Sequence, residues 1–485
     1  MGADSGVVRH GPPPGSVWSP PAVVVLGGGA AGLSAATATA AAGVAVTLVS
    51  EGPLGGDCTW HGCVPTKSLL EAAASGLTAD EALAHARAVV ARVARTESET
   101  ALRRAGVEVV RSRAHLHPGA RVRLTDGTWL EPSCGVVLTT GSRPRSAGQL
   151  GVDLPEGCTV STTDGWLDAV QAHLERGRGG RDGPVVVVGG GPSGVELAQA
   201  LARLHVGGAH PVLLLERTAS LLGAFGAAGP VVAASLAADG VQVLTGADAG
   251  RLRAAAGPGA LVLLAAGREP VLDAVCDDAV RCGPAGVVVD ASMRTGAERV
   301  CAAGDVTGLQ PSTHVAAATG RVASATLLGR SAGFDATWVP QVVYSDPEVA
   351  TVGTLGGPDP DRLTRSVRVP LSHGDRTLAA ALPGGGRAWT RGGFVQVWVT
   401  GTPEPDGDRR PGGGPLPGGG RVTGALLVGP GAGELVSEVA LVGRLGLTIE
   451  QWSGGQVGLG GMSAHHAYPT WSWLWESVTD RLLGR

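Results

Sequence analysis

A chain of 485 residues is too long for one ordinary hydrophobic core, so its length predicts two to four domains. The formal net charge of −4 provides no electrostatic case for binding nucleic acid or an anionic membrane surface. No apolar run is long enough to cross a membrane, and residues 1–20 lack the regions of a signal peptide. Together with the odd number of cysteines (7), this predicts a cytoplasmic protein with a disordered leader over residues 1–20.

The chain after the leader begins with a dinucleotide-binding pattern. Residues 23–26 predict a buried parallel strand, and a turn from Gly27 to Gly32 leads into an Ala-rich helix that extends to about residue 42. A second strand over residues 45–50 ends on Glu51. Strand, G-x-G-x-x-G, helix, strand and acid are typical of a site where helix N–H groups meet a pyrophosphate and the acid accepts from a ribose.

The next motif, from Gly55 to Lys67, contains two cysteines five positions apart, Cys58 and Cys63. Buried thiols and metal ligands are alternatives, but no second Cys pair and no His-x-x-x-His pattern follows, so no metal site is indicated. Pro65 predicts a helix that starts just after Cys63 and would stabilise a thiolate with its positive end. Lys67 is the only lysine among 38 Lys plus Arg, which favours a compact cation beside the sulfurs over chance survival.

Further along the chain we expect helical structure over residues 75–110, and short strands up to residue 139. Residues 145–180 are interpreted as a connection. A second fingerprint then follows, with a strand over 184–188, the turn from Gly189 to Gly194, a helix, and a strand over 212–215 that ends on Glu216. Between residues 244 and 261 there is barely room for one hairpin, so the second nucleotide-binding domain looks trimmed. We expect a strand over 287–290 and a helix from residue 313. Strands over 342–344, 393–398 and 424–428 mark a C-terminal part that a flexible insertion at 402–420 interrupts.

These motifs together resemble the pyridine nucleotide-disulfide oxidoreductases, over roughly residues 21–475. Besides the two fingerprints and the Cys motif, the resemblance rests on residues 140–141, 267–270, 304–305 and 345–353. It implies an α/β fold with two Rossmann-like dinucleotide-binding domains and a C-terminal α+β dimerisation domain in a homodimer. The expected parts are an FAD-binding domain (21–163 and 283–335), an NAD(P)-binding domain (164–282) and a dimerisation domain (336–485).

The resemblance also implies roles for individual residues. Cys58 would exchange with the substrate, and Cys63 would lie against the flavin as a thiolate. Lys67 would sit near flavin N5 and pair with Glu196 behind the nicotinamide. The residues expected to hold FAD are Gly27, Gly29, Ala30, Ala31, Gly32, Glu51, Gly56, Asp57, Lys67, Thr140, Gly141, Gly304 and Asp305. Those expected to hold NAD(P)H are Gly189, Gly191, Gly194, Glu216 and Gly267, and Glu216 favours NAD although Arg217 weakens that preference.

The C-terminal stretch departs from the family pattern. The family places a base, His, directly before Pro-Thr and orients it with a Glu, whereas this chain has Tyr468 and Trp473 at those positions. Tyr is a poor base at neutral pH but a usable acid, and His466 is an alternative base two positions upstream. The alternating Trp471, Trp473 and Trp475 are interpreted equally as a dimer interface or a substrate pocket.

The sequence therefore predicts an FAD- and NAD(P)H-dependent enzyme with a redox disulfide and an altered substrate side. Its expected partners are a small disulfide, thiol or quinone and a second copy of the chain. A first alternative is a reductase of quinones or other small electrophiles, which needs no thiol base. A second is a catalytically silent flavoprotein, against which the Cys pair and Lys67 argue.

Overall fold

The computed structural model describes residues 21–152, 154–180, 183–275, 278–356, 363–373, 392–401, 420–453, 472 and 474–483. The chain divides into two compact units, and each is assembled from three separate segments. Unit 1 takes residues up to Leu54, Glu97–Gly141 and Pro270–Phe334, and unit 2 takes Gly55–Thr96, Ser142–Glu269 and the residues from Asp335 onward. The predicted leader and residues 402–419 of the predicted insertion lie outside the described residues, and the predicted domain boundaries stay a prediction.

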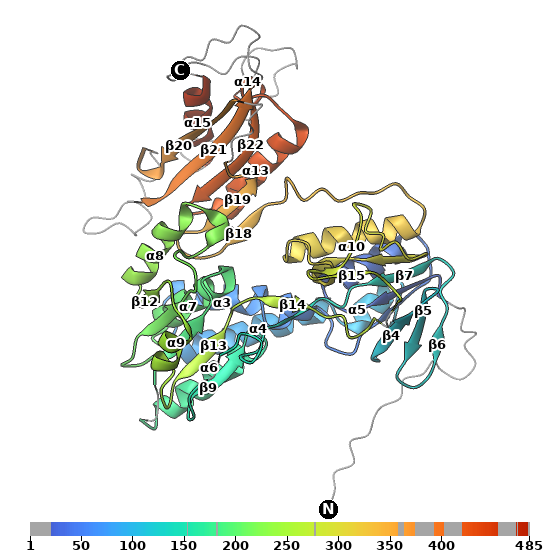
Figure 1. The fold of residues 1–485 in the computed structure, drawn as a ribbon, viewed down its shortest axis with the longest axis horizontal. Coiled ribbons are helices and arrows are strands. Elements are labelled where there is room, and N and C mark those ends of the chain that lie inside the picture. The colour runs from blue at the N-terminus through green and yellow to red at the C-terminus, as the bar shows by residue number, and fades with distance from the viewer. Residues whose placement is uncertain are drawn as a thin grey trace, which may run out of the picture. The chain divides into compact units, whose positions relative to one another are not determined.

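Unit 1 is built on a five-stranded parallel sheet with the order β17-β7-β1-β2-β3. Its central strand, β1, is fully apolar and buried, because a parallel sheet is covered on both faces. Helix α1 follows β1 and packs against α10, which Figure 1 shows in yellow. The bounds are β1 (Val23–Leu26), α1 (Ala30–Ala41), β2 (Val46–Val49), α5 (Glu99–Arg104), β3 (Val107–Val110), β7 (Gly135–Leu138), β17 (Val300–Ala302) and α10 (Thr313–Leu327).

Two smaller sheets complete unit 1. A three-stranded antiparallel sheet, with β5 in the middle, contributes its apolar face to a core shared with β1 and β7. A two-stranded hairpin precedes the short 3-10 helix η2. The bounds are β4 (Ala114–His117), β5 (Arg121–Leu124), β6 (Trp129–Leu130), β15 (Cys282–Gly283), β16 (Gly286–Val287) and η2 (Gly304–Thr307).

Unit 2 contains a second five-stranded parallel sheet, with the order β12-β11-β10-β13-β9. Helices α6 and α7 pack on its strands, and α3 packs against both α4 and α7, so the helix that begins at Cys63 shares a core with this sheet through Leu69, Leu70 and Ala72. The bounds are α2 (Gly56–Trp60), α3 (Cys63–Ala74), α4 (Ala79–Thr96), β8 (Ser142–Pro144), β9 (Thr159–Thr162), α6 (Trp166–Gly177), β10 (Val185–Val188), α7 (Pro192–Arg203), β11 (Val212–Leu215), η1 (Gly223–Phe225), α8 (Ala228–Ala238), β12 (Val241–Leu244), α9 (Ala249–Ala255), β13 (Leu261–Leu264) and β14 (Arg268–Pro270).

The C-terminal part of unit 2 is an antiparallel sheet with the order β18-β19-β22-β21-β20. Helix α13 packs on β22 and β19, and α15 packs on β20, as Figure 1 shows. The sheets and their helices confirm the predicted α/β class. The bounds are β18 (Gln341–Val343), β19 (Val349–Gly353), β20 (Leu363–Pro370), η3 (Leu371–His373), β21 (Phe394–Gly401), β22 (Arg421–Val428), α13 (Ala432–Leu445), α14 (Ile449–Trp452) and α15 (Leu474–Leu483).

Three predictions about local structure were wrong. Residues 145–180 are not a plain connection, because they provide β9, an edge strand of the second parallel sheet, and α6, whose Trp166 and Val170 are buried. The region between β12 and β13 forms helix α9, capped by Asp248, instead of a hairpin. The strand expected over residues 287–290 is reduced to β16. The helical structure expected over residues 75–110 is present as α4 and α5, the second of which begins at a Ser98 cap, before β3.

Trp475 also differs from both interpretations of the C-terminal tryptophans. Its side chain is 1% exposed and packs against Trp452 in the core of the antiparallel sheet, with 5.3 Å between ring centroids. A ring buried within its own chain contacts neither a partner subunit nor a substrate. Trp471 and Trp473 lie outside the described residues.

Candidate active site

The first cysteine lies on α2, a short helix that follows two glycines. Gly55 and Gly56 have φ angles of +98° and +63°, a left-handed conformation that side chains disfavour, which explains the Gly pair in the motif. Cys58 is half-buried in this helix. At the C-terminal end of this helix, the N–H groups of His61 and Gly62 donate to the carbonyl of Asp57.

The second cysteine is the first residue of α3. Cys63 is half-buried, and Gly62 is the N-cap of this twelve-residue helix. The first N–H groups of a helix have no intrahelical partners and carry a partial positive charge. Cys63 therefore has the environment that lowers the cost of a thiolate, as the sequence predicted.

The sole lysine forms an ion pair with Glu196. Lys67 lies one turn after Cys63 on α3, and its Nζ is 2.6 Å from Oε2 of Glu196, on α7. Glu196 is 3% exposed by side chain, and it also accepts a hydrogen bond from Thr66. Burial lowers the pKa of Lys67, but the charges of Glu196 and Cys63 outweigh burial and hold the pKa above its ordinary value. The expected pairing of Lys67 with Glu196 is present in the structure.

Tyr344 contacts both members of this ion pair, and sequence reasoning did not identify it. Its backbone N–H donates to Oε1 of Glu196 at 2.9 Å, and the ammonium of Lys67 lies 4.9 Å from its ring centroid. Tyr344 is 45% exposed, and the partial burial of its phenol raises the pKa above its ordinary value. The sequence signal was its place directly before the 345–353 motif, in a chain with only two tyrosines.

A second charged cluster surrounds Asp57, the neighbour of Cys58. Arg268, at the start of β14, lies 3.2 Å from Asp57 and 3.5 Å from Asp164, and its guanidinium is also anchored to Ser142. Burial raises the pKa of Asp57 to about 7; Arg268 opposes that increase, whereas the charges of Asp164 and Cys63 add to it. Within the cysteine motif, the pKa of Asp57 is therefore raised towards neutral pH.

Apart from Gly56, Asp57 and Lys67, which lie on α2 and α3 of unit 2, the expected FAD residues lie at one edge of the parallel sheet of unit 1. The last residues of β1, β2, β7 and β17 are in register, so the segments that follow them share the carboxyl edge. A Cβ atom on Gly27 would meet the carbonyl of Thr139, and one on Gly32 would meet the carbonyl of Gly27. Segments placed at this edge include Gly27 to Gly32 with Ala30 and Ala31 in the first turn of α1, Glu51, Thr140 and Gly141, and Gly304 with Asp305 in η2.

This edge fits a dinucleotide. A turn without Cβ atoms leads directly into the N-terminus of α1, where backbone N–H groups can reach a pyrophosphate. Gly304 adds to the close packing, because its Cβ would lie 2.9 Å from that of Ala31. Glu51 is 65% exposed by side chain, with Arg113 at 3.4 Å, and its carboxylate is available to a ribose.

The second fingerprint has the same construction in unit 2. Gly189 has a φ of +112°, and a Cβ on Gly194 would meet the carbonyl of Gly189. Glu216 accepts hydrogen bonds from the N–H groups of Gly190 and Thr218, both at 2.7 Å, so the acid lies against the glycine turn. Burial raises the pKa of Glu216, but these N–H groups outweigh it and hold the pKa below its ordinary value. Gly191 caps α7, and Gly267, with φ of +99°, follows β13 at the same edge.

The residues predicted to replace the family's base fall outside the part of the chain that the structure describes. Tyr468 and His466 lie outside the described residues, and so does Trp473. Within the described ranges, no group of three or more His, Cys, Asp or Glu is arranged to hold a metal ion. Among the helices that the structure describes, none is long and apolar enough to span a membrane.

Comparisons with known proteins agree with this arrangement. Residues 21–320 match the family described as pyridine nucleotide-disulphide oxidoreductase. The chain is 28% identical to dihydrolipoyl dehydrogenase 3 of Haloarcula marismortui, covering 94% of this chain and 95% of that protein. It is 29% identical to a mercuric reductase of Acidithiobacillus ferrooxidans, covering 88% and 78% of the two chains.

Solved structures show the same fold over nearly the whole chain. LpdA of Mycobacterium tuberculosis superimposes with a TM-score of 0.72 at 25% identity, covering 95% of this chain and 99% of that one. The flavoprotein disulfide reductase RclA of Escherichia coli superimposes with a TM-score of 0.73 at 21% identity, covering 94% and 99%.

Proposed function

Because the chain belongs to the pyridine nucleotide-disulphide oxidoreductases, whose members use FAD and NAD(P)H, we propose that it passes electrons from a reduced nicotinamide through FAD and the Cys58–Cys63 pair to a small substrate. The observation that carries this proposal is the ion pair between Lys67 and Glu196. It joins the helix that begins at Cys63 to the helix that begins at the second glycine turn. One contact thus connects the sulfur chemistry with the nicotinamide-binding element.

The two cysteines would have different chemical roles. When bound at the sheet edge of unit 1, FAD would supply the two-electron carrier between the nicotinamide and the cysteine disulfide. As the sulfur–sulfur bond breaks, Cys63 keeps its electron pair as a thiolate at the N-terminus of α3, and Cys58 takes up a proton. The Cys58 sulfur then attacks a substrate disulfide, and its proton passes to the first substrate thiol, which leaves. The Cys63 thiolate attacks the Cys58 sulfur of the mixed disulfide and expels the second substrate thiolate, which takes a proton from water, so the Cys58–Cys63 disulfide re-forms and the substrate leaves as two thiols.

The residues at the two sheet edges would bind the cofactors as expected from the fingerprints. The unit 1 residues from Gly27 to Asp305 would hold FAD, and the turn from Gly189 to Gly194 would hold the nicotinamide dinucleotide. Glu216 supports NAD over NADP, because an anionic carboxylate repels a ribose 2′-phosphate and accepts from a free 2′-hydroxyl. The proposed assembly is a homodimer.

The experiment follows the cysteines directly. The FAD-loaded protein is treated anaerobically with NADH, alkylated, and digested for mass spectrometry. We expect alkylation of Cys58 and Cys63 to rise with NADH, while that of Cys134 and Cys158 stays unchanged. If NADH reduces the flavin without changing the alkylation of Cys58 and Cys63, the disulfide route is excluded.

That last result would favour a second function, the reduction of quinones or other small electrophiles. Tyr468, in place of a basic His, supports this alternative because such a reduction does not require a base to deprotonate a thiol. Turnover of a quinone that survives in a Cys58→Ser, Cys63→Ser variant would establish it.

A further inference from the structure

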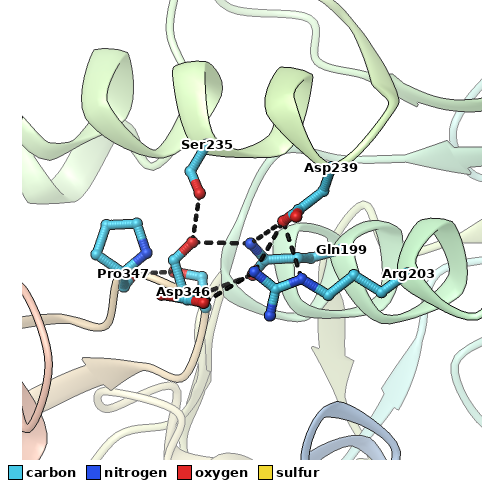
Figure 2. A network of polar contacts seen from close by, with 7 residues as sticks. Gln199, Arg203, Ser235, Asp239, Asp346 and Pro347 are labelled. Carbon is cyan, nitrogen blue, oxygen red and sulfur yellow. Dashed lines mark hydrogen bonds and ion pairs between the residues drawn. The ribbon is translucent and has the colours of Figure 1, made fainter. Parts of the chain in front are cut away.

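The turn between β18 and β19 is held by the side chains of two helices of the second parallel sheet. Figure 2 shows Gln199 and Arg203 of α7 and Ser235 of α8 converging on Asp346. The Gln199 amide accepts from the backbone N–H of Asp346 at 2.7 Å and donates to its carbonyl at 2.8 Å. Ser235 donates to the same carbonyl at 2.6 Å. The main chain of Asp346 is thus bound on both its donor and its acceptor.

Charge reinforces this attachment. The guanidinium of Arg203 lies 2.9 Å from a carboxylate oxygen of Asp346 and 2.9 Å from one of Asp239, so it bridges the two acids (Figure 2). Gln199 is fully buried and also donates to Asp239 at 2.8 Å. Buried polar groups that lose one partner pay the full cost of desolvation, so such a network resists displacement.

The same helix face also carries Glu196. Positions 196, 199 and 203 are spaced by three and four residues, which places their side chains in one row along α7. Glu196 binds the backbone N–H of Tyr344, two residues before Asp346, and Gln199 and Arg203 bind Asp346 itself. Helix α7 therefore sets the position of Tyr344 through two contacts, one with its own backbone N–H and one with Asp346, two residues later.

Tyr344 in turn contacts the Lys67 ammonium with its ring. A cation near an aromatic face gains electrostatic stabilisation, and the ring limits where the flexible Lys stem can place its charge. Lys67 is 32% exposed by side chain, so it has room to leave the pair if the ring is removed.

We propose that Tyr344 is a positioning residue of the Lys67–Glu196 pair, and that Gln199, Arg203 and Ser235 hold it there through Asp346. The inference rests on the proposed function only in that the pair serves electron transfer from the nicotinamide. The positioning itself is a property of the folded chain.

Because the chain has a single lysine, amine chemistry can test the positioning without turnover. Trace acetylation at pH 8.5, read by mass spectrometry, reports how much of Lys67 is neutral and accessible, and the α-amino group serves as an internal reference. The charged and titratable groups that face this amine are Glu196 from α7, Cys63 from its own helix, and Tyr344. A fall of one unit in the pKa of the amine raises its neutral fraction about tenfold.

We expect Tyr344→Leu to raise the acetylation rate of Lys67 by about tenfold, and Tyr344→Phe, which keeps the ring, to leave it unchanged. Asp346→Asn, which keeps the backbone groups but loses the ion pair with Arg203, should give a smaller increase in the same direction. The control is Arg87→Gln, which breaks an exposed ion pair with Asp168 elsewhere in unit 2.

Wild-type acetylation rates in folded Tyr344→Leu and Asp346→Asn proteins would overturn the inference. An equal rise in the acetylation rate of Lys67 in the Arg87→Gln protein would also overturn the inference, because the rise would then not depend on contacts with Tyr344. If acetylation rises as expected but flavin reduction by NADH keeps its wild-type rate, the positioning holds and the role of the pair in the proposed function fails. The two ideas can therefore be rejected separately.

Discussion

Lys67 and Glu196 are separated by 129 positions in the chain, yet Nζ of one lies 2.6 Å from Oε2 of the other. The carboxylate is almost fully buried and has three donors: this ammonium, the Thr66 hydroxyl and the Tyr344 N–H. Such an arrangement holds a point charge at a defined place. The first prediction follows from the geometry of that charge.

Lys67→Arg should retain FAD but slow flavin reduction by NADH, because a planar guanidinium cannot occupy the position of a compact ammonium. Since small misplacements near reacting groups are costly, we expect a loss of roughly 10- to 100-fold, measured by anaerobic stopped-flow absorbance. A matched Arg121→Lys change at the surface of unit 1 should have no effect. Wild-type reduction kinetics in Lys67→Arg would mean that the solitary lysine is a compositional accident.

The same pair predicts an asymmetry in stability. Lys67→Met leaves the buried Glu196 carboxylate without its cation, whereas Glu196→Gln keeps hydrogen-bonding groups and leaves Lys67 partly solvated. We therefore expect Lys67→Met to cost about 1–3 kcal/mol of unfolding free energy and Glu196→Gln to cost less. Urea denaturation of both variants measures this, and equal losses would contradict it.

Asp57 predicts a pH dependence. Its pKa is raised from 3.8 to about 7, mainly by burial, so between these values the folded protein binds more protons than the unfolded chain. Stability that depends on this group therefore falls as pH rises from about 4 to about 7. Asp57→Asn should remove that slope, and its melting temperature relative to wild type should increase with pH across this window. If the melting temperatures of the two proteins change with pH in parallel, the pKa of Asp57 is not raised in the folded protein.

Tyr344 can be titrated by absorbance in a Tyr468→Phe protein, where it is the only tyrosine. Burial raises its pKa above 10, and the nearby Lys67 lowers it. The absorbance change that marks phenol ionisation should therefore begin at a higher pH than for a free phenol. Adding Lys67→Met should raise the pH of this absorbance change further, because the cation that stabilises the phenolate is lost. A shift in the opposite direction on removing Lys67 would show that the ring and the ammonium are not in contact.

Much of this site is readable in the sequence because its chemistry depends on local spacing. The glycines of both fingerprints are required by backbone contacts within a few residues, such as that between Gly194 and the Gly189 carbonyl. Cys63 at the start of a helix was also predicted from the local sequence, whereas the pairing of Lys67 with Glu196, 129 positions away, was predicted only from the family resemblance. Tyr344 was not, because its role comes from a turn in the C-terminal sheet that folds onto α7, and no local pattern encodes that contact.

The same limit explains the errors in the fold. The strand β9 has the polar sequence Thr-Val-Ser-Thr, and it is a strand because β13 provides its hydrogen-bonding partners. Trp475 was one of three alternating tryptophans in the sequence, and only the packing of α15 on its own sheet shows that it belongs to the core. Tertiary contacts decide both cases.

The altered C-terminal stretch predicts weak activity towards dihydrolipoamide. General-base catalysis is typically worth roughly 10²–10⁴-fold, and Tyr468 cannot supply it at neutral pH. Turnover should rise towards alkaline pH, where the dithiol ionises unaided, and Tyr468→His with Trp473→Glu should recover part of the loss. Robust turnover by the wild type at pH 7 would mean that His466 or another group serves as the base.

The central claim is that Cys58 and Cys63 accept electrons reversibly, and an anaerobic reductive titration tests it most directly. Dithionite is added to the FAD-loaded wild type and to the Cys58→Ser, Cys63→Ser variant until the flavin is fully reduced. We predict that the wild type consumes two electrons more per chain than the variant, because its disulfide fills as well as its flavin. Equal consumption by the two proteins would contradict the account.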